Sequence, residues 1–422
     1  MKTTKNYYIK KNTTNEYLAY NKSSHTAGIF TKQGLELFEL LLKNENDITK
    51  IKSEYDIDRE TEQVLRKFSK NLTSMNLFCK TDILQGKGLK VYKQIPKQIN
   101  FYVHITSQCN LKCDYCYNAE YRERIDDLSL EQWKEIIDKI IPFAGKIIIT
   151  GGEPTLNKNL ATIIEYLKEK KEGIIIEMIS NANTDFSKLT NFKSIVNSLN
   201  NLMVSVDNIS SNDSERKGFD VAMFHKNIDY LKGSFDTKKI TLASVLSNSN
   251  RDKIYEIKQF ADDNNMQFKT TIRMPNTEKE VQLMPNLKEC RKSVSLLNGV
   301  RVDALKNKKI NCSAASTTFS ISSNGDCYPC QNFHFDEFLL GNILKSSFKD
   351  IYNNKNAVTV RTRTVNDTKK CSNCSLKYVC VGGCISQTFR NEGSIFAFPK
   401  LLCPYYKIEA EDKLIQAIKS KE

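Results

Sequence analysis

Apolar and polar residues follow three successive rhythms along the chain, and each rhythm predicts a different part of the fold. In the first part, short apolar or aromatic runs are separated by polar residues, as in β-strands joined by turns. These runs lie at 7–10, 16–20 and 27–30. Apolar positions then recur with helical spacing at 35–42, 48–55 and 60–77. Strands followed by three short helices predict a winged-helix-like module over residues 1–95.

The second rhythm alternates apolar, β-rich runs with amphipathic helical stretches and covers residues 96–295. The predicted strands lie at 100–106, 146–150, 174–180, 202–206, 239–246 and 266–273. Helices are predicted between them, and Ser129 with Gln132 three residues later marks the start of one as a capping box. Six alternating units predict an α/β fold whose parallel sheet curls into a partial (β/α)6 TIM-like barrel. Active sites of such barrels lie beyond the carboxyl ends of the strands.

In the third part, residues 296–422, the alternation stops and cysteines accumulate. The chain has thirteen cysteines in 422 residues, and its polar start and lack of a long apolar run predict neither an export signal nor a membrane span. We therefore expect a cytoplasmic protein with no membrane partner, whose cysteines bind metal or act as reactive thiols.

The formal net charge of +14 changes this picture little. Lysine and arginine are spread along the chain, which is typical of a solvated surface, so nucleic acid is an unlikely partner. A DNA-binding role for the winged-helix-like module remains the alternative.

A loop directly after the first predicted barrel strand carries Cys109, Cys113 and Cys116. Zinc sites with a structural role use four protein ligands, whereas three thiolates on a 4Fe-4S cluster leave one iron open to a chelating ligand. A zinc knuckle or a redox-active thiol cluster is the competing interpretation. With the aromatic Tyr115 before its third cysteine, the motif resembles the signature of radical S-adenosylmethionine (radical SAM) enzymes. This resemblance implies that S-adenosylmethionine binds the open iron and yields a 5'-deoxyadenosyl radical.

Further positions resemble the cofactor site of the same family. Gly151, Gly152 and Glu153 follow the second strand, and this motif implies a contact with the methionine amino group. Other implied cofactor contacts, at later strand ends and in the loops after them, are Ser180, Asn181, Ser205, Asp207, Arg216 and Leu246. Polar strand ends that simply face water are the alternative for these residues.

The cysteines of the last part resemble a SPASM domain, a seven-cysteine extension that binds two auxiliary 4Fe-4S clusters. Cys312 and Cys330 precede a C-x2-C-x5-C-x3-C run and a final cysteine. The resemblance implies an outer cluster on Cys371, Cys374, Cys380 and Cys403. It implies an inner cluster on Cys312, Cys330 and Cys384, with Cys290, Cys327 or a substrate thiol as fourth ligand. A pair of zinc ribbons would also tolerate these spacings.

In front of a radical domain, the N-terminal module resembles the PqqD-like domains that recognise leader peptides. The resemblances together imply an enzyme that binds a precursor peptide through its leader and forms a cross-link, most plausibly a cysteine thioether, with electrons from a flavodoxin or ferredoxin. Carbon-carbon cross-linking and epimerisation are alternatives. Sulfatase formylglycine maturation is disfavoured because Gln331 follows Cys330 where that group carries an aspartate. A zinc-ribbon DNA-binding regulator is the alternative from another class.

Overall fold

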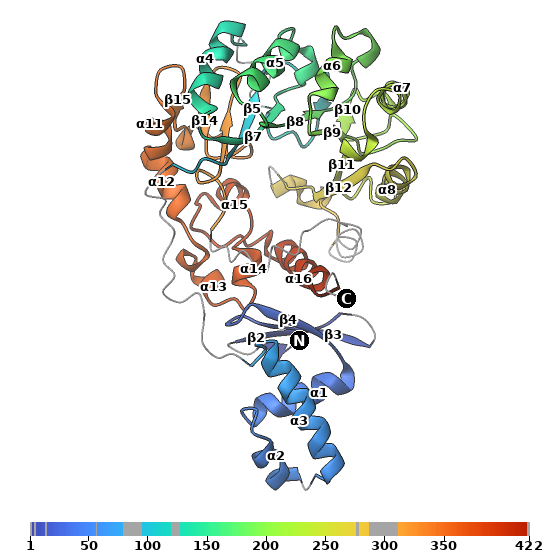
Figure 1. The fold of residues 1–422 in the computed structure, drawn as a ribbon, viewed down its shortest axis with the longest axis vertical. Coiled ribbons are helices and arrows are strands. Elements are labelled where there is room, and N and C mark those ends of the chain that lie inside the picture. The colour runs from blue at the N-terminus through green and yellow to red at the C-terminus, as the bar shows by residue number, and fades with distance from the viewer. Residues whose placement is uncertain are drawn as a thin grey trace.

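The computed structural model describes residues 2–3, 6–12, 15–55, 57–78, 95–119, 127–275, 278–286 and 311–419. Figure 1 shows the barrel domain at one end of an elongated molecule, the N-terminal domain at the other, and the cysteine-rich segments between them.

The N-terminal domain is an antiparallel four-stranded sheet in chain order, followed by three helices. Its strands are β1 (Lys2–Thr3), β2 (Tyr7–Lys11), β3 (Glu16–Asn21) and β4 (Thr26–Thr31). Its helices are α1 (Lys32–Lys43), α2 (Ile48–Tyr55) and α3 (Arg59–Ser74). Thr31 and Asp58 start α1 and α3 by accepting backbone N–H groups, so both helices begin at polar caps.

Both faces of this sheet are buried. Side chains on one face, such as Ile9 and Phe30, pack with Phe38 of α1. On the other face Tyr8 and Tyr20 pack against Leu414 of the C-terminal helix α16 (Cys403–Lys419). The Tyr8 hydroxyl donates to Glu411 of the same helix, and Lys10 forms an ion pair with it. The N-terminal domain is therefore held on the cysteine-rich region by an apolar face with a polar anchor.

The barrel domain consists of six parallel strands whose order in the sheet follows the chain. They are β5 (Ile99–His104), β7 (Ala144–Thr150), β8 (Ile175–Ser180), β9 (Asn201–Ser205), β11 (Ile240–Leu246) and β12 (Gln267–Ile272). The connecting helices are α4 (Leu130–Ile140), α5 (Leu160–Lys170), α6 (Phe192–Asn197), α7 (Val221–Lys232) and α8 (Lys253–Asp263). The capping box of Ser129 and Gln132 at the start of α4 is confirmed, and all six predicted strands are present within a few residues.

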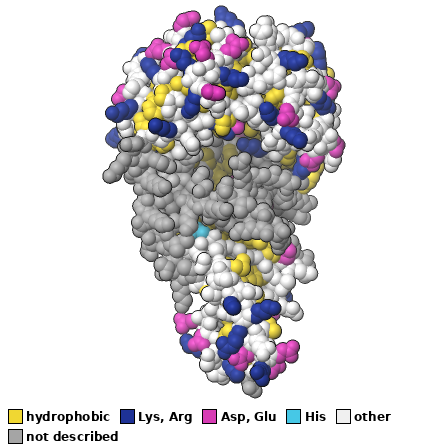
Figure 2. Space-filling view, viewed as in Figure 1, with side chains coloured by type: hydrophobic (Ala, Val, Ile, Leu, Met, Phe, Trp, Pro, Cys, Tyr) yellow, Lys and Arg dark blue, Asp and Glu magenta, His cyan; other side chains and the backbone are white. Residues whose placement is uncertain are grey.

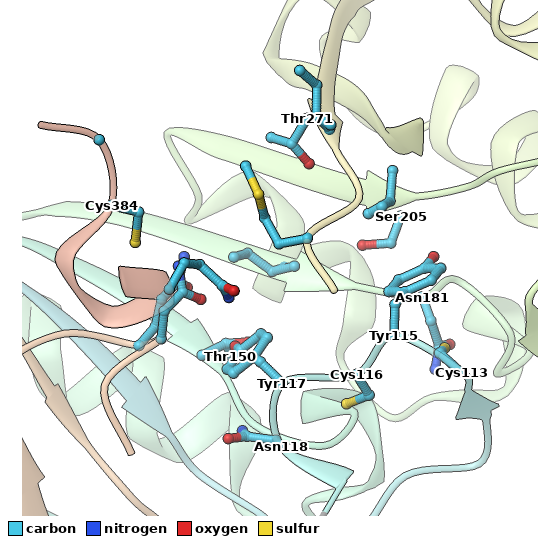
Figure 3. A pocket seen from close by; sticks show the side chains of 18 of the residues that line it. Cys113, Tyr115, Cys116, Tyr117, Asn118, Thr150, Asn181, Ser205, Thr271 and Cys384 are labelled. Atoms are coloured by element: carbon cyan, nitrogen blue, oxygen red, sulfur yellow. The ribbon is translucent and has the colours of Figure 1, made fainter. Parts of the chain in front are cut away.

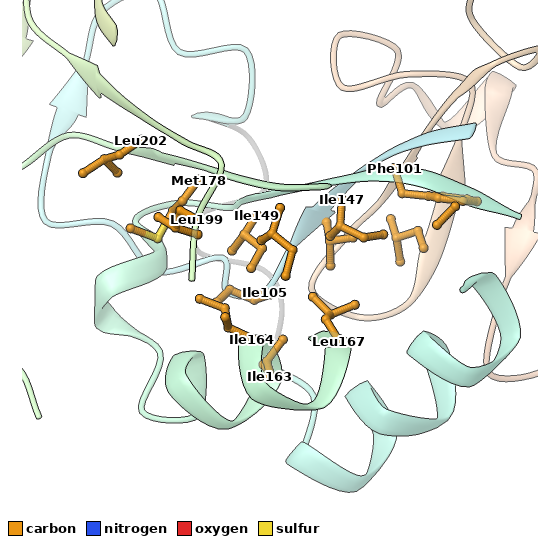
Figure 4. Close-up of a cluster of buried hydrophobic side chains, with 14 of the residues drawn as sticks. Phe101, Ile105, Ile147, Ile149, Ile163, Ile164, Leu167, Met178, Leu199 and Leu202 are labelled. Carbon is orange, nitrogen blue, oxygen red and sulfur yellow. The ribbon is translucent and has the colours of Figure 1, made fainter. Parts of the chain in front are cut away.

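The barrel core lies between the sheet and these helices. Ile147 and Ile149 on β7 meet Ile163, Ile164 and Leu167 of α5 in this layer (Figure 4). All five side chains are at most 2% exposed. Apolar burial of this extent contributes about 1.5–3 kcal/mol for each large side chain, so the layer holds the strand ends in place.

The cysteine-rich region continues the barrel sheet, which the sequence did not predict. Strand β13 (Thr318–Ile321) pairs parallel to β5, and β14 (Asp326–Tyr328) and β15 (Gly341–Asn342) extend it to nine strands. The other α-helices described in residues 311–419 are α11 (Phe348–Asn353), α12 (Lys355–Thr362), α13 (Lys369–Ser372), α14 (Lys377–Cys380) and α15 (Ile385–Glu392). One sheet therefore crosses the predicted boundary at residue 296.

On the face seen in Figure 2, Lys and Arg side chains are interspersed with Asp and Glu over the barrel domain. This distribution fits the expectation of a solvated surface. No helix in the described part of the chain is long and apolar enough to cross a membrane.

Candidate active site

The loop that carries the first three cysteines starts where β5 ends, at the carboxyl edge of the sheet. Within it, the short strand β6 (Lys112–Cys113) pairs antiparallel with β10 (Arg216–Lys217). The sulfur atoms have polar neighbours from the barrel. The Asn181 amide donates to Cys109 Sγ at 3.8 Å, and Arg216 Nη1 donates to Cys113 Sγ at 3.9 Å.

Gly151 and Gly152 let a second loop approach this one at backbone distance. The N–H of Gly152 donates to the Thr106 carbonyl at 2.8 Å, and the N–H of Glu153 donates to the Gln108 carbonyl at 2.7 Å. A Cβ at position 152 would lie 2.0 Å from the Gln108 carbonyl oxygen. Only glycine permits this contact, which ties the loop after β7 to the cysteine loop.

Glu153 is buried at the junction of three strand ends. One carboxylate oxygen accepts hydrogen bonds from the Thr155 backbone N–H, the Thr155 hydroxyl and the Ser180 hydroxyl at 3.1, 2.7 and 2.8 Å. The other accepts the Asn181 N–H at 2.7 Å. Burial raises the pKa of Glu153, and these hydrogen bonds act in the opposite direction. The carboxylate thus fixes the ends of β7 and β8 and lines the cavity described below.

Tyr115, Asp207 and Arg216 form a buried cluster. Arg216 Nε lies 3.0 Å from Asp207 Oδ2, and the Tyr115 hydroxyl donates to the same oxygen. The N–H of Val245 donates to the other Asp207 oxygen at 2.9 Å. Burial tends to lower the pKa of Arg216, but the neighbouring Asp207 charge raises it, so the guanidinium stays charged. Arg216, expected to face a cofactor carboxylate, therefore already has a protein carboxylate as partner.

One cavity of about 700 Å³ connects the barrel to the cysteine-rich region. Figure 3 shows Cys113, Cys116 and Tyr115 on one side and Cys384 on the opposite side. The predicted cofactor residues that line it are Cys109, Cys113, Tyr115, Cys116, Gly151, Gly152, Glu153, Ser180, Asn181, Ser205 and Arg216. Its size suits a cofactor together with part of a substrate.

Leu246, which was predicted to contact the cofactor, does not line the large cavity. It is 1% exposed and buried, whereas the adjacent Val245 lines the cavity. Side chains alternate between the two faces of a strand, so a shift by one residue reverses the direction of the side chain. Asp207 is likewise buried beneath the cavity rather than on its wall.

Several cavity residues had no recognisable signal in the sequence. They include Tyr117, Thr271, Gln387, Tyr406, Glu409 and Lys413. Gln387 is 8% exposed and its Oε1 has no hydrogen-bond partner among the described residues. Helix periodicity alone cannot tell such a position from an ordinary helix face, because the cavity forms only when α15 and α16 meet the barrel.

The described cysteines other than Cys327 fall into three groups. Cys109, Cys113 and Cys116 form the barrel group, and burial together with mutual repulsion raises the pKa of Cys113 to about 11. Cys330 and Cys384 form a second group with Cys312, and burial raises the pKa of Cys384 to about 11. The third group lines a separate cavity of about 490 Å³ and consists of Cys371, Cys374, Cys380 and Cys403.

These groups fit the cofactors that the resemblance implies. All described cysteines are free of disulfides. Burial raises the pKa of Cys380 to about 12, so the thiolate is unfavourable there without a cation, and coordination to iron would supply one. Within the described residues, no three His, Cys, Asp or Glu side chains converge closely enough to hold a single metal ion.

Cys327 lies apart from all three groups. It is 1% exposed, packs in the main core, and its thiol donates to the Gly325 carbonyl. Burial raises the pKa of this thiol strongly, and the nearby charge that adds to the effect is that of Asp326 rather than of another cysteine. The structure therefore does not place Cys327 as a fourth ligand of the inner cluster. Cys290 lies outside the described residues.

Comparison with known families agrees with this geometry. Residues 103–290 match the radical SAM superfamily, and residues 312–375 match an iron-sulfur cluster-binding domain, SPASM. The chain therefore contains a radical SAM domain followed by a SPASM domain. The predicted α/β fold with a partial barrel is confirmed, and the cofactor predictions, S-adenosylmethionine and 4Fe-4S clusters, agree with both matches.

Individual relatives are distant. A nucleotide dehydratase of Selenomonas ruminantium that depends on S-adenosylmethionine is 29% identical over 36% of this chain and 57% of its own length. The subtilosin biosynthesis protein AlbA of Bacillus subtilis is 25% identical over 62% of this chain and 60% of its own. The alignments span less than two thirds of either relative. Among solved structures, Streptococcus suis SuiB bound to its precursor peptide SuiA superposes with a TM-score of 0.58, at 17% identity, over 94% of this chain and 98% of that one.

Proposed function

We propose that this protein is a radical enzyme that modifies a ribosomally made precursor peptide and joins a cysteine sulfur to a carbon atom as a thioether. The observation that carries the proposal is the shared cavity, with the radical SAM cysteines on one wall and cysteines of the SPASM domain on the other. AlbA and SuiB, both similar to this chain, bear names that connect them with peptide products or precursors.

In this proposal Cys109, Cys113 and Cys116 hold the first cluster, and the wall formed by Gly152, Glu153 and Asn181 binds S-adenosylmethionine. A reduced cluster on these cysteines, together with S-adenosylmethionine bound at this wall, would supply a hydrogen-abstracting adenosyl radical. The auxiliary clusters would supply an electron acceptor. Forming a C–S bond from a C–H group and an S–H group removes one hydrogen atom, one proton and one electron from the peptide. The enclosed walls protect the carbon radical from water and from side reactions.

The wall of the large cavity that is formed by α15 and α16 suits a peptide. The side-chain carbonyl oxygen of Gln387 has no hydrogen-bond partner among the residues that the structure describes, and the carboxyl of Glu409 lines the same wall. Burial raises the pKa of Glu409, so this carboxyl gains from a hydrogen-bond donor supplied by the substrate. Peptide N–H groups are donors of this kind.

Metal content tests the assignment of the cysteines. Protein reconstituted without oxygen is expected to hold about twelve irons, since three cubes contain four each. Cys384→Ala should lower this number by about four, because its thiolate belongs to the inner group. Cys327→Ala is the matched control and should keep all the iron. Iron analysis that finds zinc instead, or iron loss in the control, would contradict the assignment.

Leader recognition is proposed for β4, the edge strand opposite β1 in the N-terminal sheet. Among described residues β4 pairs with β3 on one side only, so its other edge offers backbone groups to an added strand. A short open reading frame beside the gene, with a cysteine in its core segment, would supply the candidate peptide. Adding that peptide is expected to slow hydrogen exchange in Thr26–Thr31 and not in the core strand β13. Unchanged exchange with a peptide that becomes modified would place leader binding elsewhere.

The same proposal predicts the compartment and the electron donor. A reducing cytoplasm keeps cluster thiols available, and a flavodoxin or ferredoxin would deliver the electrons. Mass spectrometry of the peptide after turnover should show the loss of two hydrogen atoms for a thioether or carbon-carbon link. An unchanged mass with an inverted centre would indicate epimerisation instead.

A further inference from the structure

A second, small cavity lies beside the cysteine loop. It has a volume of about 40 Å³ and shares Cys109, Cys116, Asn118 and Gly152 with the large cavity. Its other lining residues carry polar side chains and come from the end of β5, the loop after it and the segment after β13: His104, Thr106, Ser107, Ser322, Ser323 and His334. It therefore lies where the barrel and the SPASM domain meet, in contact with two of the three motif cysteines.

His104 and Asn118 both have an unused polar atom in this region. The Asn118 amide group donates to Nδ1 of His104 at 2.9 Å, which leaves the imidazole proton on Nε2. Neither Nε2 of His104 nor Oδ1 of Asn118 has a hydrogen-bond partner within the described chain. The two residues are 3% and 8% exposed. Buried polar atoms are nearly always hydrogen-bonded, so one donor and one acceptor here require a further group.

The His104 ring is held firmly. Its centroid lies 4.9 Å from that of His334, which in turn stacks on Tyr328 and hydrogen-bonds Ser320. Burial lowers the pKa of His104 to about 4, so the ring is neutral near pH 7 and offers a hydrogen bond without a charge.

We propose that this cavity holds water that carries the hydrogen bond of His104 Nε2 to the sulfur atoms of Cys109 and Cys116, and that His104 thereby sets the reduction potential of the cluster on these cysteines. A cavity of this size has room for a water molecule, which needs about 10–15 Å³, and the unused atoms His104 Nε2 and Asn118 Oδ1 are a donor and an acceptor for it. Hydrogen bonds to ligand sulfurs favour the reduced, more negative cluster and raise its potential. His104 is a positioning residue in this scheme. The inference rests on the proposed function only in requiring a cluster at the motif.

The test replaces His104 with phenylalanine, which keeps a flat ring and removes both nitrogens. At the wild-type midpoint potential, the ratio of reduced to oxidised cluster is expected to fall about tenfold, a shift of about 59 mV for a one-electron couple. The measurement is a redox titration followed by electron paramagnetic resonance. The signal of interest is the one that changes on adding S-adenosylmethionine.

Three further variants separate this role from a structural one. His104→Gln restores an N–H donor and should recover most of the wild-type potential, whereas Asn118→Ala removes the anchor of His104 and should lower the potential. His225→Phe is the matched control, because His225 lies on α7 and its imidazole bonds the Ile209 carbonyl, so this variant should leave the potential unchanged.

Wild-type potentials in His104→Phe and Asn118→Ala, with full iron content, would overturn the inference and leave the proposed function intact. If His104→Phe does not fold, an unchanged reduction potential in Asn118→Ala is sufficient by itself to overturn the inference. Wild-type protein without a cluster at the motif would instead overturn the proposed function.

Discussion

Replacing Cys109, Cys113 and Cys116 together by alanine is expected to abolish the formation of 5'-deoxyadenosine from S-adenosylmethionine. These thiolates hold the first cluster in the proposed function, and the described barrel offers no other cysteines at the carboxyl edge of its strands. The loss should exceed about 10⁴-fold, because no residual group supplies the electron at the cofactor. The measurement is chromatography of the reduced, reconstituted protein after incubation with the cofactor.

The fold should survive this triple substitution. Cys109 and Cys113 only border the main core, and the loop is anchored by Gly152 and by the pairing of β6 with β10. Circular dichroism should therefore match the wild type, and about eight irons should remain on the auxiliary clusters. Persistent 5'-deoxyadenosine formation in this variant would remove the basis of the proposed function.

Gly152→Ala should have the second largest effect and should act without removing any ligand. Its Cβ would lie 2.0 Å from the Gln108 carbonyl oxygen and 2.4 Å from the Gln108 carbonyl carbon, so backbone must move. Overpacking of this kind costs about 1–3 kcal/mol of folding free energy. A displacement of about 1 Å at a catalytic loop can lower the rate about 100-fold, and we expect at least that loss of cofactor cleavage.

A matched glycine on another element separates this clash from the general cost of adding a methyl group. Gly233 ends α7 with a φ of −81°, and a Cβ there would meet nothing closer than 3.7 Å. Gly233→Ala should therefore change neither the midpoint of thermal unfolding nor cofactor cleavage beyond experimental error. Equal activity in Gly152→Ala and Gly233→Ala would show that the two loops are not locked as described.

The elements that depend on local periodicity were predictable from the sequence. All six barrel strands, the capping box at Ser129 and the sequence of strands then helices in the N-terminal domain follow from side-chain spacing within a few residues. The first cysteine motif and the C-x2-C-x5-C-x3-C run were equally clear, because their cysteines lie close together in sequence. The structure places the cysteines of the barrel group near one another, and likewise those of the outer group.

Contacts between segments that lie far apart in the chain could not be predicted from the sequence. Cys327 matches the ligand cysteines in residue type, yet β14 turns it into the core. Arg216 lines the cavity, and its contact with Asp207, which lies 3.0 Å from Nε, was not predicted. Leu246 and Val245 differ by one position on β11, and only the sheet decides which of them faces the cavity.

The sequence by itself determined the order of the domains, the strand and helix pattern, and the chemistry of the thiol clusters, because each depends on neighbouring residues. The tertiary structure decided that β13 extends the barrel sheet, that the N-terminal sheet is buried against α16, and that one cavity joins two cysteine groups. These features depend on packing between segments that are up to about four hundred residues apart, such as Tyr8 and Glu411. No local pattern of apolar and polar residues encodes such a pairing, which is why the roles proposed for His104, Gln387 and Glu409 rest on the assembled fold alone.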